Sequence, residues 1–176
     1  QVSAIVNHAG VSGINVWFFD PTVSSACGDG TDYGNLMLRR GTLPTGSFVN
    51  VSPLPEPEGD VEDRHLACWG FPTEAAEFCL THIASGADRS ATRHAQVAEI
   101  ARLMARDAQN GLSNQVLAGD FNDSPTSSNL NAIYSPVPPY GGSGVFVEGT
   151  GDRSEAAKYQ TFDVWRSVYE KIDYVF

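Results

Sequence analysis

The side chains best suited to chemistry lie in one short segment, residues 116–125 (VLAGDFNDSP). A short apolar run leads into Gly119, and Asp120, Asn122 and Asp123 follow almost at once. The pattern predicts a buried strand that opens into a polar loop, and ligands of open α/β folds bind beyond such carboxyl ends. A strand followed by an Asx-rich turn would have the same composition. The segment alone leaves both interpretations open.

Two other apolar segments also carry a polar residue that could do chemistry. His82 follows the run 78–81 (FCLT), and Asp173 lies within the run 172–175 (IDYV). A carboxylate inside an apolar strand loses much hydration free energy unless it is hydrogen-bonded, paired or metal-bound. Each residue also has a structural interpretation, since a strand-end histidine or a strand aspartate can simply bond a neighbouring loop.

The elements that must position these residues can be read from the periodicity of the chain. Strands at hairpin-like spacing surround one long helix, which predicts mixed sheets rather than strictly alternating parallel ones. Arg93 and His94 are expected on the solvent face of that helix, and Ser124 and Pro125 are expected to cap and begin the short helix after residue 123. The expected strands are 14–19, 34–40, 48–51, 65–69, 77–81, 116–119 and 171–176, and the expected helices are 1–10, 90–109 and 128–133.

Composition limits the class of protein and its partners. The 176 residues fit one globular domain, residues 1–176, with 41% hydrophobic residues and a formal net charge of −10. This charge repels polyanions and argues against docking on nucleic acid through a basic face. A bound divalent cation would reverse the local sign, so phosphate substrates stay possible. No apolar run is long enough to span a membrane.

The three cysteines suggest one pairing. Cys68 and Cys79 lie on two apolar runs joined by a Gly-Phe-Pro turn, where they could face each other across a hairpin. Either they form a disulfide, which would favour a secreted or otherwise extracytoplasmic protein, or they are free buried thiols. Cys27 has no obvious partner in the chain.

Several stretches in order resemble the endonuclease/exonuclease/phosphatase superfamily, whose members share the DNase-I-like fold. LAGDFN alone is a weak pattern, but a preceding histidine and a following Ile-Asp-Tyr-Val make a chance match improbable. The matching stretches are YGNLMLRR at 33–40, LTHI at 80–83, Gln96 on the following helix, LAGDFN at 117–122 and KIDYVF at 171–176.

The resemblance implies an α/β (α+β) fold, a four-layer αββα sandwich of two mixed β-sheets flanked by helices. It also implies phosphoester hydrolysis assisted by Mg²⁺, Mn²⁺ or Ca²⁺. By resemblance, Asp120 would orient or deprotonate the attacking water and contact the metal, and Asn122 would hold a phosphate oxygen. His82 would donate to phosphate oxygens, Asp173 would orient a histidine, and Asn35 would line the cleft.

The departures from the family pattern are equally specific. The family's first-strand Asn, its metal-binding Glu and its last-strand Ser-Asp-His have no counterpart here, so the chain is expected to be truncated at both ends. By itself it is expected to be inactive or nearly so. Ile83 stands where Leu is usual, and Arg39 where Ser is usual.

The expected substrate is a nucleic acid, a phospholipid headgroup or a small phosphodiester, and the expected state is a monomer. The alternative function is a non-catalytic DNase-I-like binding domain. Retention of His82, Asp120 and Asn122 favours the enzyme, because a decayed site would be expected to lose them first.

Overall fold

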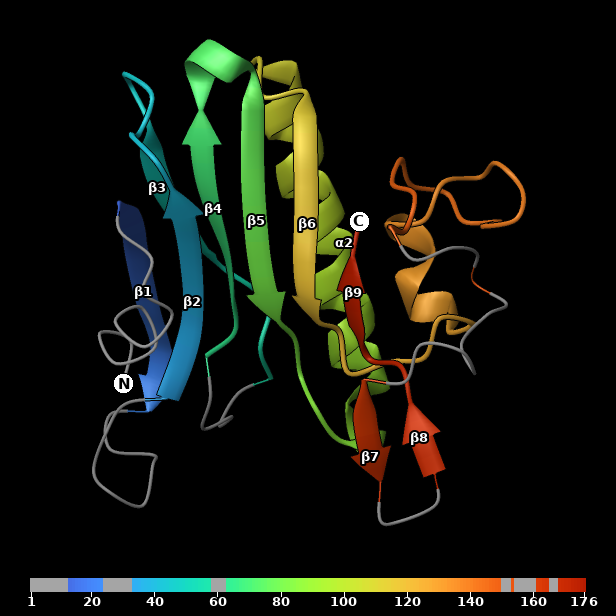
Figure 1. The fold of residues 1–176 in the computed structure, drawn as a ribbon. Coiled ribbons are helices and arrows are strands. Elements are labelled where there is room, and N and C mark those ends of the chain that lie inside the picture. The colour runs from blue at the N-terminus through green and yellow to red at the C-terminus, as the bar shows by residue number, and fades with distance from the viewer. Residues whose placement is uncertain (1–12, 24–32, 58–62, 150–152, 154–160, 165–167) are drawn as a thin grey trace.

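A five-stranded mixed sheet forms the centre of the computed structural model, which describes residues 13–23, 33–57, 63–149, 153, 161–164 and 168–176. The strand order is β3-β4-β5-β6-β9 (Figure 1). Only β5 and β6 pair in parallel, and the other three pairs in this sheet are antiparallel. The strands are β3 (Phe48–Pro53), β4 (His65–Phe71), β5 (Ala76–His82), β6 (Asn114–Asp120) and β9 (Asp173–Val175).

Helix α2 (Ser90–Gln109) connects β5 to β6 and covers one face of this sheet (Figure 1). Its apolar residues recur every three or four positions, so Val97, Ile100 and Met104 share one face and are buried in the main core. Gly111 follows with a φ of 100°, a left-handed conformation suited to glycine at a helix end. The prediction of a helix over 90–109 is confirmed. No helix in the described part of the chain is long and apolar enough to cross a membrane.

A second sheet packs on the opposite face. Strands β1 (Ile14–Val23) and β2 (Tyr33–Arg40) form an antiparallel pair, and Met37 of β2 packs with Trp69 and Phe71 of β4. The α+β fold class with face-to-face sheets is therefore confirmed. Strand β1 extends to Val23, beyond the predicted end at residue 19, because Val23 pairs with Tyr33 of β2 after an irregularity that follows Phe19. The predicted helix at 1–10 and Cys27 lie outside the described residues.

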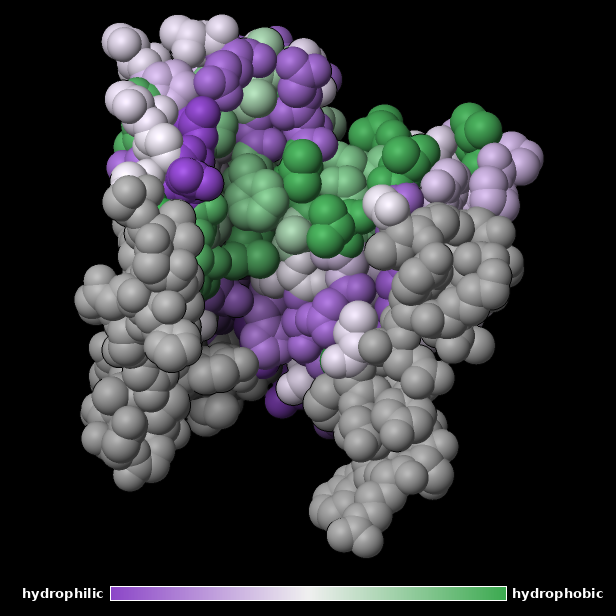
Figure 2. Space-filling model, in the orientation of Figure 1, coloured by the Kyte–Doolittle hydropathy of each residue, from purple (hydrophilic) through white to green (hydrophobic). Residues whose placement is uncertain are grey.

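Part of the five-stranded sheet is exposed on the face away from α2. Phe78, Val116 and Val175, on β5, β6 and β9, are 36%, 39% and 51% exposed. Figure 2 shows apolar surface over β5 and β6, with polar surface toward the carboxyl ends of these strands. The described residues of β1 and β2 thus cover this face only in part.

Short elements surround the C-terminal half of the large sheet. The turn 124–127 closes through the Ser127 N–H, which donates to the Ser124 carbonyl at 3.0 Å. The Ser127 side chain then caps the next helix. The expected cap at Ser124 and first helical residue at Pro125 are therefore wrong, because the turn 124–127 comes before the helix. The remaining elements are η1 (Pro72–Glu74), η2 (Ala87–Arg89), η3 (Ser128–Ala132), β7 (Phe162–Val164) and β8 (Val168–Glu170).

Cys68 and Cys79 are joined by a disulfide in the main core. The two residues are direct partners in the antiparallel register of β4 and β5. Neighbouring partners in such a register hold their Cβ atoms about 4.5–5.5 Å apart, which brings two cysteine side chains together. The hairpin geometry accounts for the pairing.

Glu77 is a buried carboxyl on β5, 3% exposed. Burial, with a smaller contribution from Asp107, raises the pKa of Glu77 from 4.5 to about 7. The folded protein therefore holds a proton that the unfolded chain loses at lower pH, so this residue makes stability fall as pH rises from about 4.5 to 7.

Glu77→Gln is expected to stabilise the protein by about 3 kcal/mol at pH 8 and by almost nothing at pH 4. The amide keeps an oxygen for the Gln115 side chain, which donates to Glu77 at 2.6 Å. Urea unfolding across this pH range measures the difference. Glu74→Gln, at a carboxylate that pairs with Arg39 and has a side chain 47% exposed, is the control. A gain for Glu77→Gln that is equal at both pH values would contradict the assignment.

Candidate active site at the carboxyl ends of β5 and β6

Three polar residues form a row across three neighbouring strands. His82 ends β5 and is the register partner of Asp120, which ends β6; Asp120 is in turn the partner of Asp173, which begins β9. His82 Nε2 lies 3.6 Å from Asp120 Oδ2. The fold thus brings together three of the predicted site residues from distant parts of the sequence.

Gly119 allows β5 and β6 to approach closely just before the row. Its φ is 149°, and a Cβ atom at this position would lie 2.0 Å from the Thr81 carbonyl oxygen. No other residue has room there, because that distance is far inside van der Waals contact. The glycine therefore belongs to the geometry that sets His82 beside Asp120.

Hydrogen bonds fix the carboxylate of Asp120 and the loop that follows it. The backbone N–H of Asn122 donates to Asp120 Oδ1 at 2.8 Å, and Asn122 has a left-handed φ of 46°. The Asn122 side chain donates through Nδ2 to the Ile83 carbonyl at 2.9 Å. The loops after β5 and β6 are thereby tied together.

Burial shifts the pKa of two members of the row toward their neutral forms. The pKa of Asp120 is raised to about 6, mainly by burial and further by Asp173, while the Asn122 N–H opposes the shift. The pKa of His82 is lowered to about 4 by burial and by the charge of Arg64. At neutral pH the row therefore holds a neutral imidazole beside a carboxylate.

Asp173 is more exposed than the sequence predicted. It is exposed at the first position of β9, and its N–H donates to Thr161 Oγ1 at 3.1 Å. The expectation of a carboxylate buried within an apolar strand is wrong, because the strand begins only at this residue and its side chain reaches solvent. Its place in the row comes from the register instead.

Asn35 is not joined to the row. It lies half-buried on β2, paired with Phe19 of β1 in the other sheet. Among the residues that the structure describes, no hydrogen bond connects it to His82, Asp120 or Asn122. Its part in a cleft stays a prediction.

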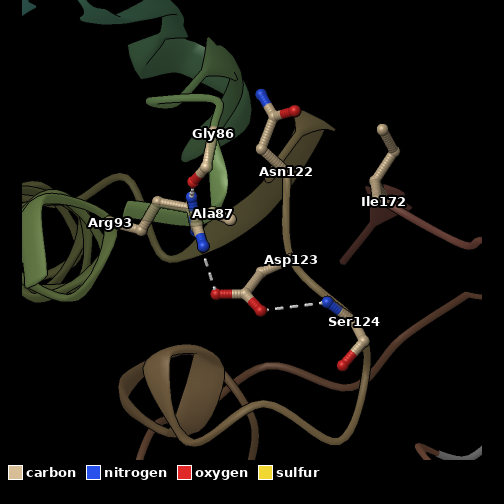
Figure 3. Close-up of a pocket in the computed structure, with 7 residues that line it drawn as sticks. All are labelled: Gly86, Ala87, Arg93, Asn122, Asp123, Ser124 and Ile172. Carbon is tan, nitrogen blue, oxygen red and sulfur yellow. Dashed lines mark hydrogen bonds and ion pairs between the residues drawn. The ribbon is translucent and has the colours of Figure 1, made fainter. Parts of the chain in front are cut away.

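A cavity of about 380 Å³ adjoins the row on the side of Asn122 (Figure 3). Its walls come from the loops after β5 and β6, the first turns of α2 and the residue before β9. The side chains of Ala87 and Ile172 are apolar, and the other side chains of the lining are polar. The lining residues are Gly86, Ala87, Arg93, Asn122, Asp123, Ser124 and Ile172.

Arg93 is buried, not solvated as expected, and only 7% exposed. Its Nε donates to Asp123 Oδ2 at 3.1 Å, and its guanidinium also donates to the Gly86 carbonyl at 2.7 Å (Figure 3). Helical periodicity placed it on the polar face, but that face meets the loop after β6, whose carboxylate balances the charge. His94 is exposed as expected. Arg93 was missed as a residue of the site because its partner is distant in sequence.

Gln96 supports the loop that follows His82. It is fully buried; its Oε1 accepts from the Ala84 N–H at 2.8 Å and its Nε2 donates to the Pro55 carbonyl at 2.9 Å. A buried amide with these partners is fully engaged and has a positioning role.

The five-stranded mixed sheet, with the antiparallel pair of β1 and β2 packed on it, has the fold of endonuclease/exonuclease/phosphatase structures. No protein-family model and no curated protein matches the sequence. The similarity to solved structures establishes the fold.

Three solved structures of this fold are similar to nearly the whole chain. The human Nocturnin catalytic domain with bound sulfate is 16% identical, with a TM-score of 0.58 over 99% of this chain and 63% of that one. ANGEL2, a 2′,3′-cyclic phosphatase, is 15% identical, with a TM-score of 0.57 over 99% and 65%. An endonuclease/exonuclease/phosphatase family protein from Bacteroides thetaiotaomicron is 14% identical, with a TM-score of 0.58 over 95% and 60%. The chain thus spans less than two thirds of each structure.

Proposed function

We propose that this protein hydrolyses phosphoesters by attack of water on phosphorus, with the row of His82, Asp120 and Asp173 and the neighbouring Asn122 as its active site. The observation that carries the proposal is the register of the row, which unites three distant polar residues at adjacent strand ends. The fold shared with phosphatase structures such as ANGEL2 supports it.

Each residue has a role that follows from its surroundings. Asp120, held by the Asn122 N–H, orients the attacking water and accepts its proton. His82 is neutral at pH 7, so it donates a hydrogen bond to a phosphate oxygen without adding a full charge. One Nδ2 hydrogen of Asn122 is used by Ile83, which leaves the second for a phosphate oxygen.

A hard divalent cation such as Mg²⁺ fits this donor set. Asp120 and Asp173 are neighbouring carboxylates on paired strands, and Asp173 raises the pKa of Asp120, a repulsion that a cation relieves. Mg²⁺ needs only one or two carboxylates, because it keeps several of its waters. These two residues would hold it, and when bound it would neutralise charge that develops on the phosphate.

Hydrolysis with and without metal, followed by chromatography of the products, tests the proposal. The 176-residue chain and longer forms of the protein are incubated with a 2′,3′-cyclic nucleotide, a sugar phosphate, a single-stranded oligonucleotide and a phospholipid headgroup diester. We expect turnover of at least one substrate by a longer form in Mg²⁺, little or no turnover by the chain alone, and loss of turnover in EDTA. Restoration by Mn²⁺ would indicate a hard-cation site.

Binding without turnover is the outcome that overturns this function. If no form cleaves any of the four substrates but one substrate still binds, the non-catalytic binding domain is the better description. Turnover that persists in EDTA would contradict the metal-assisted part of the proposal.

A further inference from the structure

A second cluster of potential metal ligands lies in the core, away from the row. Cys68 and Cys79 are register partners on β4 and β5, and Glu77 precedes Cys79 by two positions, so all three point to the face that packs on α2. Their ligand atoms lie within 4.8 Å of one another, and all three residues are buried. The proposed phosphoesterase chemistry uses none of them.

We propose that this cluster, when its disulfide is reduced, binds one thiophilic divalent cation of the zinc class through the sulfurs of Cys68 and Cys79 and the carboxylate of Glu77. Reduction breaks the sulfur–sulfur bond: a dithiol reductant supplies two electrons and two protons and is itself oxidised to a disulfide. Binding then releases one proton from each thiol, because the thiolate is the ligand. Two thiolates and one further protein ligand, with an open fourth position, are a known zinc arrangement.

The surroundings of Glu77 hold its carboxylate in place. The Gln115 side chain donates both to Glu77 Oε1 at 2.6 Å and to the Met104 carbonyl of α2 at 2.7 Å. Such an outer hydrogen bond fixes a ligating carboxylate and tunes its affinity.

The surface nearest the cluster lies on the side of Glu77. A cavity of about 260 Å³ lies near this end of β5, and Asp107, one of its lining residues, interacts electrostatically with Glu77. Phe48, another lining residue, packs its ring over Gly70, the register partner of Glu77. The cavity therefore lies on the side of the cluster where Glu77 stands.

Cobalt titration tests the proposal, because cobalt bound by thiolates gives charge-transfer absorption. The protein carries Cys27→Ser to remove the third thiol, is reduced with dithiothreitol and is freed of reductant without air. We expect one equivalent of Co²⁺ to give this absorption in the reduced form and none in the oxidised form, with displacement by Zn²⁺. Cys68→Ser should abolish it, and Glu77→Gln should weaken binding about tenfold to a hundredfold.

Glu74→Gln, at an exposed glutamate outside the cluster, is the matched control and should bind like the parent. The proposal fails if the reduced protein stays folded by circular dichroism but shows no absorption, or if Glu77→Gln binds as well as the control. It also fails if reduction unfolds the protein and added Zn²⁺ does not restore the fold. Failure would leave the phosphoesterase proposal untouched, because phosphoester hydrolysis is assayed on the oxidised protein.

Discussion

Asp120→Asn is expected to lower phosphoester turnover about 10²–10⁴-fold while leaving the protein folded. The amide cannot accept the proton of the attacking water, but its oxygen can still accept the Asn122 N–H that holds the wild-type carboxylate. Initial rates at saturating and at low substrate, measured in a form of the protein that turns over, give kcat and kcat/KM. A fall in both indicates lost transition-state stabilisation.

The same substitution should make the fold more stable above pH 6. The folded pKa of Asp120 is raised from 3.8 to about 6, so ionisation at higher pH weakens the folded state relative to the unfolded chain. Without metal at pH 8, Asn is expected to gain about 2 kcal/mol. Asp63→Asn, at an exposed carboxylate, is the control for both measurements. Lost activity with lost stability would mean a folding defect instead.

Gly119→Ala is expected to destabilise the protein by about 3–5 kcal/mol. The added Cβ meets the Thr81 carbonyl at 2.0 Å, and β5 and β6 must separate to admit it. Because His82 and Asp120 are the next register pair, the separation also opens the row. Urea unfolding measures the loss.

Gly111→Ala separates steric clash from backbone strain. Gly111 also has a positive φ, 100°, but a Cβ there has nothing within 4 Å. Its replacement should cost only about 1–2 kcal/mol. Equal losses at both positions would show that strain alone is responsible and that the close approach of β5 to β6 does not matter.

The sequence predicted the local elements well because their signals are local. The period of the helix over 90–109 and the apolar runs of β4, β5 and β6 are contained in a few residues each, and the structure has all of them. The short pair β7 and β8 was missed, since three-residue strands carry no readable alternation.

Contacts between distant segments explain what was mispredicted in the site. The burial of Arg93 depends on Asp123, and the exposure of Asp173 depends on where β9 starts, so neither could be read from neighbouring residues. The resemblance to a family predicted that His82, Asp120 and Asp173 belong to one site. Periodicity could not, because it predicts single elements and not which of them lie side by side. Glu77 is an acidic residue in an apolar run, and this local pattern could have predicted a buried carboxyl on β5.

The strand order implies an order of assembly. Strands β3, β4 and β5 are successive hairpin partners, whereas β6 joins β5 only after α2, and β9 joins β6 from the far end of the chain through three register pairs. Contacts that close long loops form late and open early. We therefore expect Asp173 to reach its place after His82 and Asp120, and to leave first when the protein begins to unfold. The row is then complete only in molecules in which β9 has docked on β6.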